Sequence, residues 1–448
     1  MLRHFAISFF LASVAICTWG RTRPHYGGTL HVETAGDAWE RPDGIARRLV
    51  YDGLTQMDGH GALQPALALT WESDNANHRW QFRLRPGVRF HDGSLLTSAS
   101  VVASLSVSCS ADCPWTAVKA VGPLVVFTSD SPMPNLPALL ASDQFLIALV
   151  ATADGKTPVG AIGTGPFQVT GFNNGVLALI ANENGWSGRP FADAIEIRPR
   201  RAVREQWLDL SLGHADLVEV PAEQIRQAQQ QKLTVLTSPP VMMVALQVSD
   251  SGALANVKLR GAIAAAVDRS ALYNVIFQKQ GEVTASLLPQ RLTGYSFLFP
   301  TDRDLNKANE LRGGLTTTQL TLSAEGDAAM QLAAQRIALN LHEAGFNVQG
   351  TNVSAQHADI VLRKLLIAGS DPAAVLERIV WDTGKVGLIT EQTDAALFKR
   401  EQTILDDKRI VPLLCLPEAF ASGPRVRDLH LRADGTADLA DASLEDTR

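Results

Sequence analysis

Stretches in which apolar and polar residues alternate recur along the chain, and each predicts a strand with one buried face. Residues 80–85 alternate strictly, and Pro86-Gly87 then turns the chain toward a short strand at residues 88–90, so a hairpin is expected. A second hairpin is predicted from residues 165–170 and 176–180, because the intervening Asn173-Asn174-Gly175 is a strong turn signal. Further strands are expected at residues 28–33, 124–128, 194–198, 216–220, 241–248 and 346–349, and from residue 411.

Apolar residues spaced three or four apart predict helices between these strands. Helices are expected at residues 45–54, from about residue 98, at 204–212 before Gly213, and from Pro221. Three later helices carry apolar stripes, formed by Leu259, Ile263 and Val267, by Met330, Ala334, Ile337 and Leu341, and by Leu397, Phe398 and Leu405. Interleaved strands and helices predict an α/β fold. The chain has 448 residues and 46% hydrophobic content, which is more than a single hydrophobic core usually contains, so two or more domains are expected.

The N-terminus has the pattern of a secretory signal. Arg3 supplies a positive charge, residues 5–19 are almost entirely apolar, and polar residues 21–24 follow. The apolar stretch suits a signal peptide over residues 1–20 and is short for a membrane-spanning helix, although an uncleaved anchor is the alternative. Cys17 ends this stretch, as a lipidated cysteine would, but Ile16 before it is larger than a lipoprotein signal requires.

Charge and cysteine content narrow the classes of partner. The formal net charge is −6, and acidic and basic residues are interspersed, so the basic cluster that nucleic acid requires is missing. Cys109 and Cys113 are close enough in sequence for a local disulfide in an oxidising compartment, and free thiols are the alternative. A zinc site would need two more ligands of similar spacing. Cys415 lies in an apolar run and is expected in the core.

Motifs of catalysis and cofactor binding are also missing. Neither G-x-S-x-G nor H-E-x-x-H occurs, and residues 163–166 lack the spacing of a nucleotide-binding loop. His91 precedes a turn and suits a turn-stabilising hydrogen bond better than a metal site, since it has no obvious partner ligands. We therefore expect no enzyme activity, no cofactor and no metal.

Seven segments resemble, in order, those of one family: the dipeptide-, oligopeptide- and nickel-binding proteins of ABC importers, or bacterial extracellular solute-binding protein family 5. The longest, WQFRLRPGVRFHDG at residues 80–93, resembles the family's xFxLRxGVKFHDG. The others are LVYDGLT (49–55), LQPALALTWE (63–72), GTGPF (163–167), NGWSGRPF (184–191), GHADL (213–217), and VKLRGA with AVDR (257–269). Single matches are weak, whereas seven in the family's order favour the family's fold.

The resemblance implies a two-lobed periplasmic-binding-protein fold of type II, in the large peptide-binding class. Lobe I would comprise residues 27–48, 150–238 and 417–448, lobe II residues 239–416, and residues 49–149 would be a subdomain inserted in lobe I. It also implies a monomer in the periplasm or another extracytoplasmic space, free or anchored by its N-terminus. Such a protein captures a peptide or other small solute by lobe closure and delivers it to a membrane permease. A ligand sensor or peptide chaperone with the same fold is the alternative.

The resemblance suggests which side chains would line the cleft. In place of the family's WxxDxxDP, residues 365–372 keep Asp371-Pro372 but lack the tryptophan and the earlier aspartate. In peptide binders that aspartate pairs with the ligand's amino terminus. We therefore expect a ligand without an ammonium group, or one held through Asp371 alone. The candidate ligand-binding residues are Trp39, Gln247, Arg363, Asp371 and Trp381, each with an ordinary surface, ion-paired or core role as the alternative.

Overall fold

The computed structural model describes residues 25–37, 45–109, 113–150, 161–294, 299–314, 319–350, 357–383, 389–391 and 393–445. The predicted signal peptide with Cys17, and the candidate residue Trp39, lie outside these residues. Among the helices of the described residues, none combines the length and apolar character that crossing a bilayer requires.

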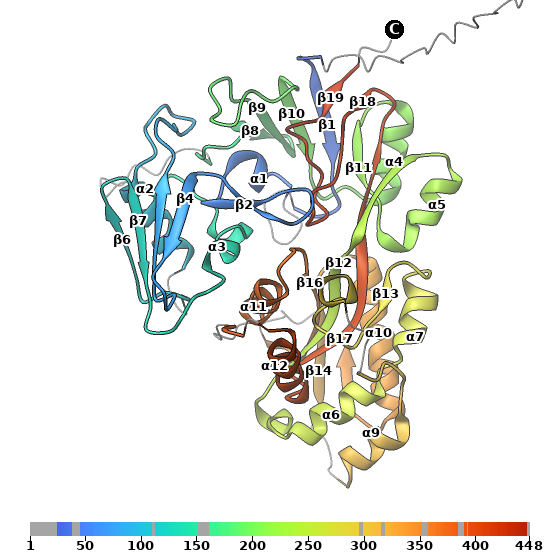
Figure 1. The fold of residues 1–448 in the computed structure, drawn as a ribbon. Coiled ribbons are helices and arrows are strands. Elements are labelled where there is room, and N and C mark those ends of the chain that lie inside the picture. Colours follow the sequence, from blue (N-terminus) through green and yellow to red (C-terminus); the bar gives the residue numbers. More distant parts are fainter. Residues whose placement is uncertain are drawn as a thin grey trace, which may run out of the picture.

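Two long antiparallel strands connect the upper and lower halves of the molecule (Figure 1). They are β12 (Thr234–Val248) and β17 (Ile410–Ser422), and both belong to one sheet in the order β15-β14-β16-β12-β17-β11-β1-β10-β9-β8, with β13 also paired to β17. Their register shifts on both sides of Pro240, which pairs with Pro417. Proline lacks the N–H that a ladder needs, so an irregularity is expected there. The break falls at the predicted lobe boundary, although the division into lobes stays a prediction.

The upper half, as we use the term, contains the strands and helices on the β11 side of this break. Its hydrophobic core contains residues of β1, β9 and β10. β1 lies between β10 and β11 and pairs in parallel with both, at the centre of this part of the sheet. Its elements are β1 (Thr29–Glu33), α1 (Arg47–Val50), β8 (Phe167–Asn173), β9 (Val176–Ala181), β10 (Ala194–Arg198), α4 (Val203–Leu212), β11 (Leu217–Glu219), η2 (Ala222–Gln224), α5 (Ile225–Gln230), β18 (Val426–Arg427) and β19 (Ser443–Leu444).

The lower half contains the elements between β12 and β17 in sequence. The apolar faces of α6 and α10 pack against one face of the sheet and form a first core with it. Helices α11 and α12 lie on the other face and form a second core (Figure 1). The elements are η3 (Gly252–Ala255), α6 (Val257–Ala266), α7 (Arg269–Ala271), η4 (Leu272–Ile276), β13 (Glu282–Val283), α8 (Gln290–Thr293), α9 (Leu305–Arg312), β14 (Leu320–Ala324), α10 (Ala328–Glu343), β15 (Val348–Gly350), β16 (Ile360–Leu366), α11 (Pro372–Asp382) and α12 (Asp394–Asp406).

A separate four-stranded sheet with its own aromatic core lies beside the upper half, and we call it and its neighbouring elements the side unit (Figure 1). Phe82, Phe127 and Trp115 form its centre through edge-on ring contacts. The elements are β2 (Thr55–Met57), β3 (Leu63–Pro65), β4 (Ala68–Ser73), β5 (Arg79–Leu84), α2 (Ser98–Ser108), β6 (Ala117–Val121), β7 (Leu124–Thr128), α3 (Leu136–Leu139) and η1 (Asp143–Phe145). Cys109, which follows α2, is joined to Cys113 by a disulfide, with Cα atoms 5.6 Å apart.

The structure confirms one predicted hairpin and corrects the other. β8 and β9 pair through Asn173 and Val176, and the turn residues Asn174 and Gly175 both have positive φ. The hairpin expected from residues 80–85 and 88–90 is wrong. Both edges of β5 are already occupied, by β4 and β7, so residues 88–90 contribute only an isolated bridge from Arg89. The first predicted helix is also shorter than expected, since α1 ends at Val50.

Four of the segments that carry the family resemblance meet around one buried carboxyl group. Asp52 accepts hydrogen bonds from the Thr164 hydroxyl and the Trp186 indole N–H, each at 2.8 Å. Burial raises the pKa of Asp52, against the lowering effect of these two donors. His91 lies next to this group, with its Nε2 3.0 Å from the Gly165 carbonyl oxygen. These motif residues therefore hold the side unit to the upper half, and the expected structural role of His91 agrees with its contacts.

Replacing Gly163 by alanine should destabilise this junction. A Cβ at this position would lie 2.0 Å from the carbonyl oxygen of Val50 and 2.6 Å from a ring carbon of Tyr51, so the backbone would have to move. Forced overpacking of this kind costs about 1–3 kcal/mol. Urea denaturation should show that loss for Gly163→Ala and almost none for Gly314→Ala, whose Cβ would meet nothing within 4 Å. Equal midpoints for the two variants would contradict the close approach.

Candidate functional site

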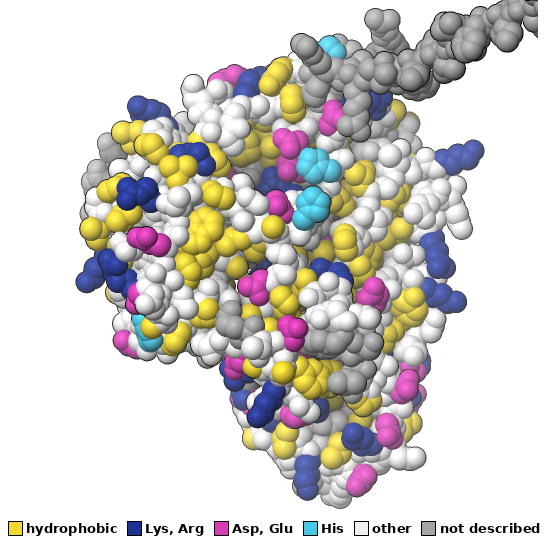
Figure 2. Space-filling model, viewed as in Figure 1, with side chains coloured by type: hydrophobic (Ala, Val, Ile, Leu, Met, Phe, Trp, Pro, Cys, Tyr) yellow, Lys and Arg dark blue, Asp and Glu magenta, His cyan; other side chains and the backbone are white. Residues whose placement is uncertain are grey.

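A cavity lies where the side unit, the lower half and the connecting strands meet. Its volume is about 520 Å³, within the usual range of small-molecule sites. On the face drawn in Figure 2, histidine and acidic side chains lie beside a hollow between these parts of the molecule. The cavity is lined by Gly59, His60 and Gly61 between β2 and β3, by Leu236, Thr237, Ser238, Pro239 and Val241 of β12, by Arg291 of α8, by Gly369, and by residues 429–433.

A second, smaller cavity adjoins the first, since both are lined by Gly61 and Gly369. Its volume is about 80 Å³, and it lies between the side unit and the start of α11. The backbone N–H of Ser370 donates to the Gly61 carbonyl at 3.1 Å, so the two parts touch here. Asp371 and Arg378 also line this smaller space.

Two arginines at these cavities donate hydrogen bonds to neighbouring backbone carbonyl groups. The Arg291 guanidinium donates to Ile367 at 2.9 Å, and that of Arg378 donates to Ala368. Partial desolvation lowers the pKa of Arg291, and burial lowers that of Arg378. The Nε of Arg378 is buried without a hydrogen-bond partner among the described residues. Two guanidinium groups therefore lie at the segment between β16 and α11, and Asp382, Asp434 and Asp143 act on the charge of Arg378.

The other arginine that lines the large cavity is already neutralised. Arg432 donates to both carboxylate oxygens of Asp438, at 3.0 and 3.1 Å. Burial acts to lower the pKa of Arg432, but the charge and hydrogen bonds of Asp438 outweigh it and raise the pKa. His430 lies near Asp438 and Asp441, a grouping that could hold a metal ion. Because Arg432 already occupies both oxygens of Asp438, an ion-pair network explains this group better than a metal site.

Helix α11 of the lower half also touches the side unit through polar side chains. The Asn135 amide donates to the Glu377 carboxylate at 2.9 Å and to the Ile389 carbonyl at 3.1 Å. Nearby, the Trp381 indole N–H donates to Gln144 at 2.7 Å, and its ring lies 6.2 Å from that of Phe145. Burial raises the pKa of Glu377 to about 7, against the lowering effect of Asn135. The lower half and the side unit are thus in contact on this side of the cavities.

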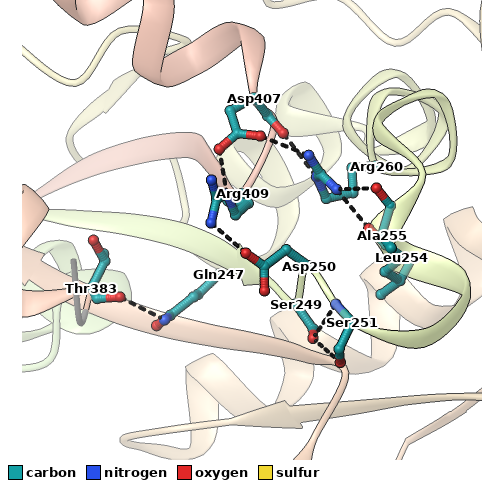
Figure 3. A network of polar contacts seen from close by, with 10 residues as sticks. All are labelled: Gln247, Ser249, Asp250, Ser251, Leu254, Ala255, Arg260, Thr383, Asp407 and Arg409. Atoms are coloured by element: carbon teal, nitrogen blue, oxygen red, sulfur yellow. Dashed lines mark hydrogen bonds and ion pairs between the residues drawn. The ribbon is translucent and has the colours of Figure 1, made fainter.

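The candidate residues named from the sequence lie in several places. Gln247 and Arg363 come together, since the guanidinium donates to the Gln247 amide oxygen at 2.7 Å and also forms a two-pronged ion pair with Glu325. The Gln247 amide in turn donates to the Thr383 carbonyl (Figure 3). Neither residue lines the two cavities, and Trp381 does not either. Asp371 lines the smaller one, and its carboxylate caps α11 by accepting from the Ala373 N–H.

Sequence reasoning missed Arg291 and Arg378, and it missed the contact of Asn135 with Glu377. None of these four residues belongs to a segment that carries the family resemblance. Asn135 and Glu377 are 242 positions apart, so no local pattern could pair them. Residues 365–378 contain one arginine and two acidic residues, so the composition of this segment gave no signal for a basic site.

Comparison with protein families gives a match over most of the chain. The model described as bacterial extracellular solute-binding proteins, family 5 (middle region) matches residues 62–385. The glutathione-binding protein GsiB of Pectobacterium atrosepticum is 25% identical over 350 residues, covering 72% of this chain and 68% of that protein. The HTH-type transcriptional regulator SgrR of the same organism is 34% identical over 162 residues, covering 34% of this chain. The chain spans only 28% of the length of SgrR.

Comparison with solved structures extends over nearly the whole chain. The oligopeptide-binding protein AppA of Bacillus subtilis, in complex with a nonapeptide, superimposes with a TM-score of 0.76 at 18% identity. The match covers 94% of this chain and 100% of that one. At this identity the likeness shows the fold, a two-lobed α/β architecture, as the sequence predicted.

Proposed function

This chain belongs to the bacterial extracellular solute-binding proteins, family 5, and from that premise we propose that it is the substrate-binding component of an ABC importer. It captures a peptide or other small solute outside the cytoplasm and delivers it to a membrane permease. It works as a monomer and by binding, without chemical change to the solute. The single observation that carries this proposal is the cavity of about 520 Å³ at the meeting point of the side unit, the lower half and the connecting strands.

The mechanism follows from how these parts are connected. β12 and β17 are the paired strands between the halves, and their register is irregular at Pro240, so bending there would change the angle between the halves. Opening would separate Asn135 from Glu377 and Trp381 from Gln144, and it would expose the cavity. Closing around a solute would restore these contacts and remove the solute from water. A ligand that favours the closed arrangement shifts the population toward it, and the permease would recognise that arrangement.

Subcellular fractionation with mapping of the mature N-terminus tests this proposal. The importer component should be found outside the cytoplasm and should lack the residues before about Arg21. A sensor that acts on DNA, as the name HTH-type transcriptional regulator implies for SgrR, would have to stay in the cytoplasm. A full-length cytoplasmic product would therefore reject the importer proposal and support the sensor alternative.

A further inference from the structure

The charged side chains that line the two cavities are mostly basic. Arg291, Arg378 and Arg432 line them, together with His60 and His430. Within the described parts of the chain, Asp371 is the one acidic residue that lines either cavity, and it is exposed and caps α11. Asp438 offsets the charge of Arg432 through two hydrogen bonds. The cavities therefore present a surplus of positive charge toward a bound solute.

Of the three arginines, Arg291 is the one whose guanidinium a solute in the large cavity can reach. Its side chain remains accessible to solvent, and its hydrogen bond goes to the neutral Ile367 carbonyl. Glu282 acts on its charge from a distance, but no ion pair joins the two in the described part of the chain. A guanidinium has five N–H donors in a planar fork, so most of its hydrogen-bonding capacity remains for a ligand.

We propose that the large cavity binds a small organic anion, whose carboxylate or phosphate group is held by Arg291. This inference rests on the proposed function and names the ligand class for the same site. The contacts of Arg291 support it, because its hydrogen bond goes to a neutral carbonyl and no ion pair among the described residues compensates its charge. Arg378 is a weaker candidate, since Asp382, Asp434 and Asp143 already act on its charge. None of the described residues that line the large cavity offers a carboxylate to a ligand ammonium group.

The rest of the cavity wall favours an organic anion over a simple inorganic one. Leu236, Val241, Leu429 and Leu431 contribute apolar surface beside the arginine. A cavity of about 520 Å³ is far larger than a phosphate ion alone would need. Apolar contact would bind the body of the solute, while Arg291 would fix the position of its charged end.

Thermal-shift titrations of the mature protein with matched probes test the ligand class. The anionic probes are succinate, N-acetyl-dialanine, glycerol 2-phosphate and inorganic phosphate, and the cationic probe is dialanine amide, all at equal ionic strength against sodium chloride. We expect at least one organic anion to raise the Tm and dialanine amide to have no effect. The carboxylate and organic phosphate arms show which anionic group the site prefers, and inorganic phosphate controls for the charge alone.

Variants locate the effect at the cavity. Arg291→Gln should weaken the apparent affinity of the effective anion about tenfold or more, because it removes a charge-assisted and potentially two-pronged interaction. Arg378→Gln should weaken it less. If burial of Arg378 prevents that variant from folding, Arg291→Gln decides alone, since its side chain is exposed. The matched control is Arg83→Gln, which removes an exposed arginine from β5, remote from both cavities.

The proposal is overturned if no organic anion raises the Tm above the chloride control, if dialanine amide binds as well as the anions, or if the shift survives in Arg291→Gln. A result that rules out an anionic ligand can be distinguished from a result that rules out the proposed function. A neutral or cationic solute that co-purifies with the protein and binds it would refute the anion but leave a solute-binding protein.

Discussion

Replacing Arg260 by alanine should lower the free energy of unfolding by about 1–3 kcal/mol, the usual cost of leaving buried hydrogen-bond acceptors without a donor. Arg260 belongs to α6, is only 4% exposed and lies in one of the segments that carry the family resemblance. Its guanidinium holds together parts of the lower half that are far apart in sequence. Loss of the side chain would leave several acceptors unpaired in a place that water reaches poorly.

The contacts of Arg260 explain the size of this effect (Figure 3). The guanidinium donates to the carboxylate of Asp407 at 2.7 Å and to the backbone carbonyl of the same residue at 2.8 Å. It also donates to the carbonyls of Leu254 and Ala255, at 2.6 and 3.1 Å. Arg409 on the far side of Asp407 extends the network to Asp250. Arg260 is therefore the centre that joins η3, α6 and the turn before β17.

Urea denaturation followed by circular dichroism measures the effect. Lys258→Ala is a suitable control, because Lys258 is an exposed residue of the same helix. Arg260→Lys should recover only part of the loss, since a lysine cannot reproduce the fork of hydrogen bonds. A midpoint for Arg260→Ala that matches the Lys258→Ala control would show that the network contributes nothing to stability.

Stability should fall as the pH rises from about 4.5 to about 7, and Glu377 should be responsible for a change of about 3 kcal/mol. Burial raises the pKa of Glu377 from the ordinary 4.5 to about 7, so in this window the folded state binds a proton that the unfolded chain has released. The folded state is therefore favoured on the acid side, and the advantage is lost as the pH approaches 7. Asn135 and the Ile389 N–H act in the opposite direction, and Asp371 acts in the same direction as burial.

Glu377→Gln isolates this contribution, because glutamine stays neutral at every pH. The variant should be more stable than the wild-type protein at pH 8 and close to it at pH 4.5, as measured by urea denaturation at both values. Glu310→Gln on the exposed face of α9 is the control and should show no such difference. If wild type and Glu377→Gln have parallel pH profiles, Glu377 is not held in the desolvated environment described above. Since Glu377 contacts the side unit, the same protonation should also favour contact between the side unit and the lower half.

Much of the fold was predictable because it depends on local patterns. The helix that ends at Gly213, the stripes of α6 and α10, and the turn at Asn174-Gly175 follow from residues close in sequence. The hairpin expected after Pro86-Gly87 was wrong for a non-local reason. A turn signal does not reveal that β4 and β7, from either side in sequence, already occupy both edges of β5.

The site was less predictable than the fold. The family resemblance pointed to residues 365–372, and this segment does border both cavities through Gly369. Arg291 reaches the same segment from a short helix with no distinctive pattern, and Arg378 does so from α11. The side chains of Gln247 and Arg363 turn instead toward each other, and Arg363 also pairs with Glu325. Spacing along the chain carries no information about such contacts between remote segments.

Native mass spectrometry of the protein purified from its own compartment tests most directly that it is a solute-binding protein. The account predicts a species heavier than the mature polypeptide by the mass of one small solute, released on unfolding and identifiable as an organic anion. The same preparation of Arg291→Gln should carry less of that solute than Arg83→Gln. A wild-type protein that carries only its polypeptide mass, and that gains no bound solute on incubation with the small-molecule extract of its compartment, would contradict the account.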